Sequence, residues 1–569
     1  RQQRLKNGHS LYQLSTSNGL IAAVYNASSN KVEQVYPHIF SAYDSAAFVL
    51  PFVSNISPNL AEKPQAVYYL KNTHVIEAKY RHFVIDYCAS FSHADKIFYA
   101  VVRGAPKDIA AISFAYDGAP GLEIQSVTRG SGKNTEKYFL FGFTDTNHAE
   151  SGMEKAKTLI AGSPVSLVDA ETDAMRGVFA RCRFPKKLNR AERNLMEQSV
   201  SVLKMSQVAD NEVFPLAKGQ ILASLRPGVW SISWVRDAAF AIAAMTKLGL
   251  YEEAKKGLEF MLNAAPSNQY KHFIHSDGKD YGIGVDYQIS VTRYFGNGRE
   301  ESDFDRRGPN IEIDDFGLFL IALCDYVQTS GDTVFYQKWQ SVLQTKVADA
   351  IVHNINAQNI IRADSGPWEH HLPGRSFVFT SGVCSRGLKQ FAVLQQQSGF
   401  ASAPYYAAAK RLHDGVMTHM LYENRLLKGN ATDQLPTDHY FFDAASFELF
   451  ANGFVLNKSL FLSHMQAYDR ELRLKSGKKM GYIRFNSSDS YENQEWPFAS
   501  MRVAVAQTIF GNRAEAKRLM ARVTQIASHN YHLIPEIITL DEEAYKGSLP
   551  MVGYGAGAYV LGIWAVYQR

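Results

Sequence analysis

The pattern of apolar and polar positions divides the chain into two regions. Residues 1–180 hold short runs rich in β-branched and aromatic side chains, among them 20–25, 82–88 and 97–102. Such runs suit a pleated, half-buried surface. Turn-forming clusters such as 129–132 separate them, which is typical of many short strands. We therefore predict an antiparallel β-sandwich over residues 1–180.

Further along the chain, the apolar period becomes helical. Residues 191–207 place apolar side chains at helical spacing between polar and charged ones. The stretch 181–187 before them is basic and contains Pro185, which indicates a domain boundary. We predict a linker over 181–192 and a helical domain over 193–569.

The connections between the predicted helices alternate between short and long. The short ones contain Gly or polar residues that let antiparallel helices turn back, at Gly249, 330–332, 398–400, Gly453 and 511–512. The long ones are 209–233, 264–312, 355–379, 422–442, 470–493 and 528–549. If consecutive helices are antiparallel, every long connection leaves at the same end. Hairpins of this kind closed into a ring form an (α/α)6 barrel, and loops of this length usually carry function. An open solenoid would need a recurring sequence period, which the chain lacks.

Composition narrows the class of ligand. The 569 residues include 60 Lys and Arg against 55 Asp and Glu, a formal net charge of +5. This balance gives no basic stripe and argues against a dedicated nucleic-acid binder. Charged residues make up only 20% and aromatic residues 12%, which excludes a disordered chain. The sequence has no run of about 20 apolar residues, so we expect no membrane insertion. The aromatic excess points to a stacked, neutral ligand.

The spacing of the cysteines indicates no metal site and no particular disulfide. Cys88, Cys182, Cys324 and Cys384 are too widely spaced to form a zinc site. Buried free thiols are the favoured interpretation, and a disulfide stays open. The chain begins at Arg1, which is compatible with a signal peptide removed before it. We expect a periplasmic or secreted location slightly over a cytoplasmic one, and no cofactor.

The first long connection ends in Trp234, Arg236 and Asp237. An Arg and an Asp side by side at a helix start can bind neighbouring sugar hydroxyls, because one donates and the other accepts hydrogen bonds. The alternative is an Asp favoured by the helix dipole, with the Arg as its partner.

The third long connection contains Trp368, Glu369, His370 and His371. A Glu beside a Trp is a candidate general acid, because an apolar neighbour favours the protonated carboxyl group. The alternative is a surface Glu beside a packing Trp. Adjacent His side chains point differently along most backbones, so we expect no metal site there.

The last two long connections add Arg484 and Glu536. Pro535 stiffens the backbone before Glu536, which suits a rigidly held base; the alternative is an ordinary exposed Glu. Two Glu, two Arg and several aromatic residues thus gather at one predicted mouth. The aromatic residues are Trp230, Trp234, Trp368, Tyr482, Tyr491 and Trp496. Paired carboxylates with aromatic platforms are typical of glycoside hydrolysis.

These segments resemble glycoside hydrolase family 15, the glucoamylase and glucodextranase family, in the same order over roughly 190–569. Residues 234–237 are similar to that family's Trp-x-Arg-Asp, whose Arg–Asp pair holds the terminal glucose. Trp368 and Glu369 are similar to its Trp-Glu segment with the general acid. Residues 482–485 resemble the segment with a second sugar-binding Arg, and 534–536 resemble the stretch with the general base. Bacterial members also carry an N-terminal β-sandwich.

The resemblance implies an inverting, exo-acting hydrolase that releases β-glucose from the non-reducing ends of α-glucans or oligosaccharides. Glu369 would be the general acid and Glu536 the general base, with their carboxyl groups about 6.5–9.5 Å apart. The implied substrate-binding residues are Trp234, Arg236, Asp237, Trp368 and Arg484.

Departures from the family pattern at His370, Ile537 and 554–558 leave the linkage open between α-1,4, α-1,6 and the α,α-1,1 bond of a trehalase. A disaccharide phosphorylase and a catalytically inactive carbohydrate-binding protein are further alternatives. Glu492 and Glu495 are the rival candidates for the base.

Overall fold

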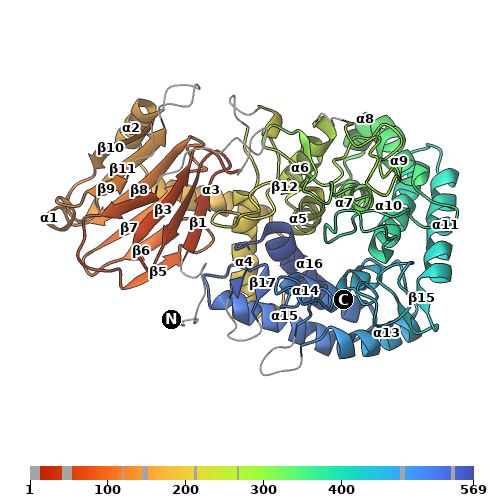
Figure 1. The fold of residues 1–569 in the computed structure, drawn as a ribbon. Helices are drawn as coiled ribbons and strands as arrows, with labels where there is room; N and C mark the ends of the chain where they lie inside the picture. The colour runs from red at the N-terminus through yellow and green to blue at the C-terminus, as the bar shows by residue number, and fades with distance from the viewer. Residues whose placement is uncertain are drawn as a thin grey trace.

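The computed structural model describes residues 13–40, 54–117, 121–143, 152–210, 215–264, 268–474, 481–539, 545–546 and 548–568. Its N-terminal part consists of two antiparallel sheets (Figure 1). One sheet has the order β1-β2-β3-β4-β9. Its strands are β1 (Gln13–Ser17), β2 (Ala22–Asn26), β3 (Lys31–Tyr36), β4 (Ser54–Pro58) and β9 (Phe114–Asp117). The other has the order β10-β11-β8-β7-β6-β5. Its strands are β5 (Ala66–Tyr69), β6 (Ile76–Lys79), β7 (Phe83–Ala89), β8 (Ile97–Gly104), β10 (Leu122–Arg129) and β11 (Thr135–Phe143).

The central strand β8 shows why its sequence is continuously apolar. Phe98 and Ala100 belong to the core between the two sheets, whereas Tyr99 and Val101 belong to a second cluster on the opposite face. Helices α2 (Met153–Gly162) and α3 (Leu167–Arg181) supply the other side of that second cluster. A strand that is buried on both faces loses the apolar–polar alternation of a half-exposed one.

The prediction of a β-sandwich is confirmed, but its extension as β structure to residue 180 was wrong. Helices α2 and α3 occupy most of 153–181. In α3, Leu167, Met175 and Val178 are buried on one face at helical spacing, a period that was not separated from the strands in the sequence. A short helix, α1 (Pro106–Ile109), lies between β8 and β9.

The chain then leaves the sandwich for the barrel. Helix α4 begins at Arg190, where Asn189 accepts a hydrogen bond from the backbone of Glu192 and the Glu192 side chain accepts one from the Asn189 backbone. This reciprocal cap defines the start of the helix. The division into 1–180, a linker 181–192 and 193–569 stays a prediction.

The helical part forms an (α/α)6 barrel, as predicted (Figure 1). Each helix of the inner ring contacts the next, and α16 returns to contact α5. The inner helices are α5 (Val235–Leu248), α7 (Asp314–Ser330), α10 (Val378–Gln397), α12 (Glu448–Ala451), α14 (Pro497–Ile509) and α16 (Ala558–Tyr567). The outer helices are α4 (Arg190–Met205), α6 (Tyr251–Asn263), α8 (Thr333–Leu343), α9 (Asp349–His353), α11 (Ala403–His419), α13 (Lys458–Glu471) and α15 (Arg513–Ser528). One continuous apolar core fills the space between the two layers.

Short turns join each inner helix to the outer helix that follows it. Gly249, with φ 88°, ends α5 two residues before α6 begins, and Gly331, with φ 77°, does the same between α7 and α8. Glycine adopts this left-handed backbone without strain. The long connections therefore lie at the opposite end of the barrel, although parts of 209–233, 264–312, 470–493 and 528–549 fall outside the described residues.

Short strands brace these long connections. They are β12 (Ser233–Trp234), β13 (Arg293–Tyr294), β14 (Glu300–Glu301), β15 (Leu421–Tyr422), β16 (Leu426–Leu427), β17 (Ile537–Ile538) and β18 (Tyr545–Lys546). In the part of the chain that the structure describes, no helix is both long and apolar enough to cross a bilayer.

Candidate active site

The start of α5 brings Arg236 and Asp237 into the mouth of the barrel. Strand β12 pairs with β13, so Trp234 is fixed just before the helix begins at Val235. Arg236 and Asp237 lie in the first turn and are only 3% and 6% exposed. The predicted position of this pair at the start of a helix is confirmed. Both side chains are more buried than an ordinary capping Asp and its partner require.

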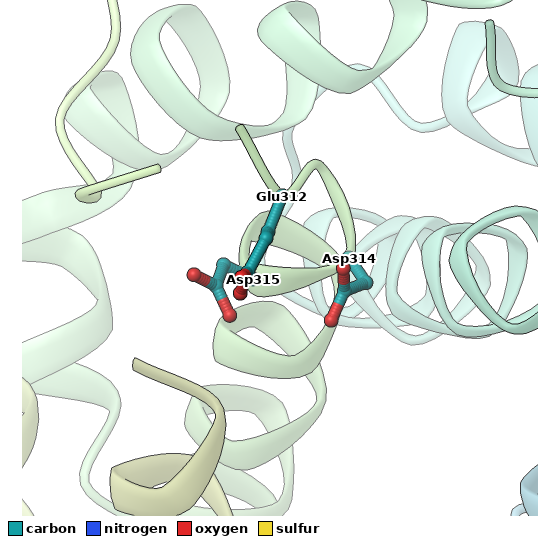
Figure 2. A group of neighbouring side chains, drawn as sticks. All are labelled: Glu312, Asp314 and Asp315. Carbon is teal, nitrogen blue, oxygen red and sulfur yellow. The ribbon is translucent and has the colours of Figure 1, made fainter. Parts of the chain in front are cut away.

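Arg236 is held by a group of buried acids at the beginning of α7. Its Nη1 donates to Glu312 Oε2 at 2.7 Å and to Asp314 Oδ2 at 3.1 Å, and lies 3.9 Å from Asp315 Oδ1. Its Nε donates to the hydroxyl of Tyr554 at 2.7 Å. Figure 2 shows the three acidic side chains gathered at the start of the helix.

The three acids are close enough together to hold a metal ion, and a set of carboxylates suits hard cations. However, the guanidinium of Arg236 already lies among them and supplies a positive charge at that position. Burial raises the pKa of Glu312 and of Asp315 well above the ordinary range, while Arg236 lowers both. The group is therefore best described as the anchor of Arg236. It was not predicted from the sequence, although three acids in four positions before an apolar helix were visible there.

Arg236 and the two candidate catalytic carboxyl groups all influence the pKa of Asp237. Burial raises its pKa to about 8, Arg236 opposes this rise, and the nearby carboxyl groups of Glu369 and Glu536 add to it. Its Oδ1 is buried without a hydrogen-bond partner in the described part of the chain. An unsatisfied buried oxygen at a site mouth is a natural acceptor for a ligand hydroxyl.

Glu369 stands on a tightly turned loop before α10. Its φ is 59°, and its backbone N–H donates to Gly366 O at 3.3 Å. The carboxylate of Asp364, beneath the loop, accepts from the backbone of Gly366 at 3.1 Å. Glu369 is half-buried, and its Oε1 accepts a hydrogen bond from Trp234 Nε1 at 2.7 Å. A left-handed backbone at a non-glycine residue is costly and frequent at functional sites.

Glu536 is held more tightly. It is 7% exposed, and its carboxylate accepts hydrogen bonds from Tyr491 OH at 2.6 Å, from the backbone N–H of Ser548 at 2.9 Å, and from Trp230 Nε1 at 3.0 Å to each oxygen. Burial raises its pKa, and these donors and Arg484 oppose the rise. The alternative of an ordinary exposed Glu at this position is therefore wrong.

The two candidate carboxyl groups belong to one site. The rings of Trp230 and Trp234 pack edge-to-face with centroids 5.6 Å apart. Trp230 donates to Glu536 and Trp234 donates to Glu369. The pair of indoles therefore bridges the two carboxyl groups, although their catalytic roles stay predictions.

Arg484 lies in an aromatic sandwich in the same mouth. Its guanidinium carbon is 4.6 Å from the ring centroid of Trp368 and 4.1 Å from that of Trp496. Its Nε donates to Glu492 at 2.6 Å. Trp368 is in turn fixed, because its Nε1 donates to Asp443 Oδ1 at 2.7 Å.

The rival candidates for the base have other partners. Glu492 is bound to Arg484, and Glu495 is 1% exposed and accepts from Arg522 Nη2 at 2.9 Å. A carboxylate that neutralises a buried Arg is poorly placed to accept a proton from water.

His370 and His371 point to different neighbours. The ring of His370 packs against Tyr440 with centroids 4.5 Å apart, and His371 Nδ1 lies 2.9 Å from Gly308 O. The two imidazoles therefore face different neighbours. This is the outcome that we predicted from their adjacent positions in the chain.

Two sheets packed as a sandwich, followed by an (α/α)6 barrel, define the glucoamylase-like fold. A bacterial glucoamylase complexed with acarbose superposes on this chain with a TM-score of 0.69 at 12% identity, over 100% of this chain and 95% of its own. Two structures of glycosidase variants, the second in complex with glucose, match with TM-scores of 0.53 and 0.52 at 16% and 15% identity. Each covers 67% of this chain and 99% of its own. The predicted resemblance is thus confirmed at the level of the fold. No family model and no curated protein matches the sequence.

Proposed function

We propose that this protein is an inverting, exo-acting α-glucoside hydrolase that releases β-glucose from the non-reducing ends of α-glucans or oligosaccharides. The observation that carries the proposal is the indole pair that joins Glu369 and Glu536 across one site. Glycoside hydrolysis with inversion needs two carboxyl groups on opposite sides of the scissile bond. The comparison fold, in which a bacterial glucoamylase binds acarbose, supports the same substrate class.

In the proposed mechanism, Glu369 protonates the leaving oxygen and Glu536 removes a proton from the attacking water. Water forms a bond to the anomeric carbon on the face opposite the breaking bond, so the product is the β-anomer. Each proton transfer contributes about 10²–10⁴-fold to the rate. Glu369 has Trp234 Nε1 as its partner, which leaves its second oxygen for the leaving group.

Arg236, Asp237 and Arg484 are the proposed sugar-binding groups. The unpartnered Oδ1 of Asp237 accepts from a hydroxyl of the terminal sugar. Arg484 donates from the guanidinium nitrogen that does not bind Glu492. Trp368 and Trp234 supply the aromatic walls on which a sugar face packs.

The test is to incubate the protein with maltose, isomaltose, trehalose and longer α-glucans. NMR of the anomeric proton then identifies the anomer of the glucose that is released first. We expect β-glucose from an α-glucoside; α-glucose as first product would refute inversion. Release of glucose 1-phosphate only when phosphate is present would indicate a phosphorylase. Binding without turnover of any substrate would indicate an inactive carbohydrate-binding protein. Turnover of trehalose alone would indicate a trehalase.

Two variants test the assignment of roles. Glu369→Gln and Glu536→Gln should each lower kcat by at least about 10²-fold with an unchanged circular dichroism spectrum. The matched control is Glu252→Gln, which alters a carboxylate on α6 that is 77% exposed and away from the site. Near-normal turnover by Glu536→Gln would transfer the role of base to another carboxyl group.

A further inference from the structure

Tyr491 occupies a defined position beside the candidate base. Its hydroxyl donates to Glu536 Oε1 at 2.6 Å. Its ring packs edge-on against Trp496, with centroids 5.2 Å apart, and Trp496 Nε1 donates to the Tyr491 carbonyl at 3.1 Å. Asp489 accepts from the Tyr491 backbone N–H at 2.8 Å. Because these contacts hold both the ring and the backbone of Tyr491, they also fix the position of its hydroxyl.

The next residue in the chain holds a different part of the site. Glu492 accepts from Arg484 Nε at 2.6 Å, and the Arg484 guanidinium lies 5.1 Å from the centroid of the Tyr491 ring. One turn of backbone, 489–492, therefore fixes the candidate base with one side chain and the sugar-binding Arg with the next.

We propose that Tyr491 is a positioning residue that aims the carboxylate of Glu536 at the attacking water, while Glu492 on the same turn aims Arg484 at the sugar. The last torsion of a Glu side chain has a broad, roughly two-fold energy profile, so hydrogen bonds rather than rotamer preference must set the plane of the carboxylate. A base acts only when a lone pair faces the proton that it accepts. This inference rests on the proposed function, because it assigns Glu536 the role of base.

The charges around Glu536 set the direction of a pH effect. Burial disfavours its ionised form, whereas the donors Tyr491, Ser548 and Trp230 and the charge of Arg484 stabilise it. The charge of Glu536 in turn raises the pKa of Asp237. Removing the Tyr491 hydroxyl removes a donor to the charged form, so the pKa of Glu536 rises. A hydrogen bond to a charged group contributes enough to move that pKa by about one unit.

The experiment compares Tyr491→Phe with Glu492→Gln. For Tyr491→Phe we expect kcat to fall by about 10–100-fold with KM changed by less than about threefold, as for a misaligned catalytic group. The acid limb of kcat/KM should move up by about one pH unit. For Glu492→Gln we expect KM to rise by about tenfold, with no upward shift of the acid limb, because the variant removes a negative charge beside Arg484. The matched control is Tyr405→Phe, which removes a 2.8 Å hydrogen bond to Asp349 outside the site.

A direct readout separates this inference from the proposed function. In protein labelled with ¹³C-Glu, the infrared carboxyl band that disappears in Glu536→Gln reports the ionisation of Glu536 itself. A higher titration midpoint in Tyr491→Phe than in the unmodified protein supports the inference even if no glucoside is hydrolysed. An identical midpoint, or an acid limb and kcat equal to those of Tyr405→Phe, overturns it whether or not the protein is a hydrolase.

Discussion

Replacing Arg236 with Met removes the cation from the acidic group at the start of α7. Arg236 is 3% exposed, and the side chains of Glu312, Asp314 and Asp315 are fully buried. Removing one partner of a buried ion pair leaves an uncompensated charge and costs about 3–5 kcal/mol. The helical region has about 380 residues, and at about 2.1 cal/mol/K for each residue its unfolding entropy is about 0.8 kcal/mol/K. We therefore expect Tm to fall by about 4–6 °C at pH 8.

The loss should depend on pH with a definite sign. Burial raises the pKa of Asp314 and Asp315 in the folded protein, and Arg236 opposes the rise. Without Arg236 these carboxyl groups stay protonated to a higher pH in the folded state than in the unfolded state, whose Asp pKa is about 3.9. The folded state then binds more protons, so stability falls as pH rises from about 4 through the folded pKa values. The Tm difference from the unmodified protein should thus be smaller at pH 5 than at pH 8.

Differential scanning fluorimetry at the two pH values measures this difference, at one scan rate. The control is Arg502→Met, because Arg502 binds a single carboxylate, Glu448, with hydrogen bonds of 2.6 and 2.9 Å in the same barrel. Its Tm loss should be smaller than that of Arg236→Met at pH 8. Equal losses for Arg236→Met at pH 5 and pH 8 would refute the argument that unpaired carboxylates cause the destabilisation.

Three further predictions concern the mouth of the barrel. Gly553→Ala should lower Tm strongly, since an added Cβ would collide with the backbone oxygen of Asp237; an unchanged Tm contradicts this close packing. Trp234→Phe should lower kcat about tenfold without unfolding the protein, because Glu369 loses its 2.7 Å donor; steady-state kinetics decides this. The acid limb of kcat/KM should lie above the ordinary Glu value of about 4.3, because burial raises the pKa of Glu536 and the base works only when ionised; a pH profile with a lower limb would contradict it.

Much of the fold could be predicted from local patterns. Glycines such as Gly249 and Gly331 mark the short turns, and the alternation of short and long connections then orders the helices in a ring. The β runs were visible because β8 and its neighbours are buried on both faces. The helical period of α3 was missed because its buried apolar positions are few and only one other helix, α2, separates it from the last strand, β11.

The candidate site was predictable in its residues but not in their contacts. Glu369 and Glu536 stood out because of their neighbours Trp368 and Pro535. That Trp234, rather than the adjacent Trp368, donates to Glu369 depends on a contact over 135 positions of sequence. The hydrogen bond from Tyr491 to Glu536 spans 45 positions. Such contacts are set by closure of the barrel, which no local period encodes.

We infer from the balance of charge at the candidate site that water, rather than phosphate, is the nucleophile of the proposed reaction. A phosphorylase must bind a phosphate anion beside the anomeric carbon, and Arg is the usual partner of such an anion. Here Arg236 already donates to Glu312 and Asp314, and Arg484 already donates to Glu492. Neither guanidinium therefore brings an uncompensated positive charge. Carboxylates nearby instead stabilise the positive charge that develops on the sugar ring in an oxocarbenium-like transition state. The arrangement thus offers phosphate no free cation and fits the proposed hydrolysis better than phosphorolysis.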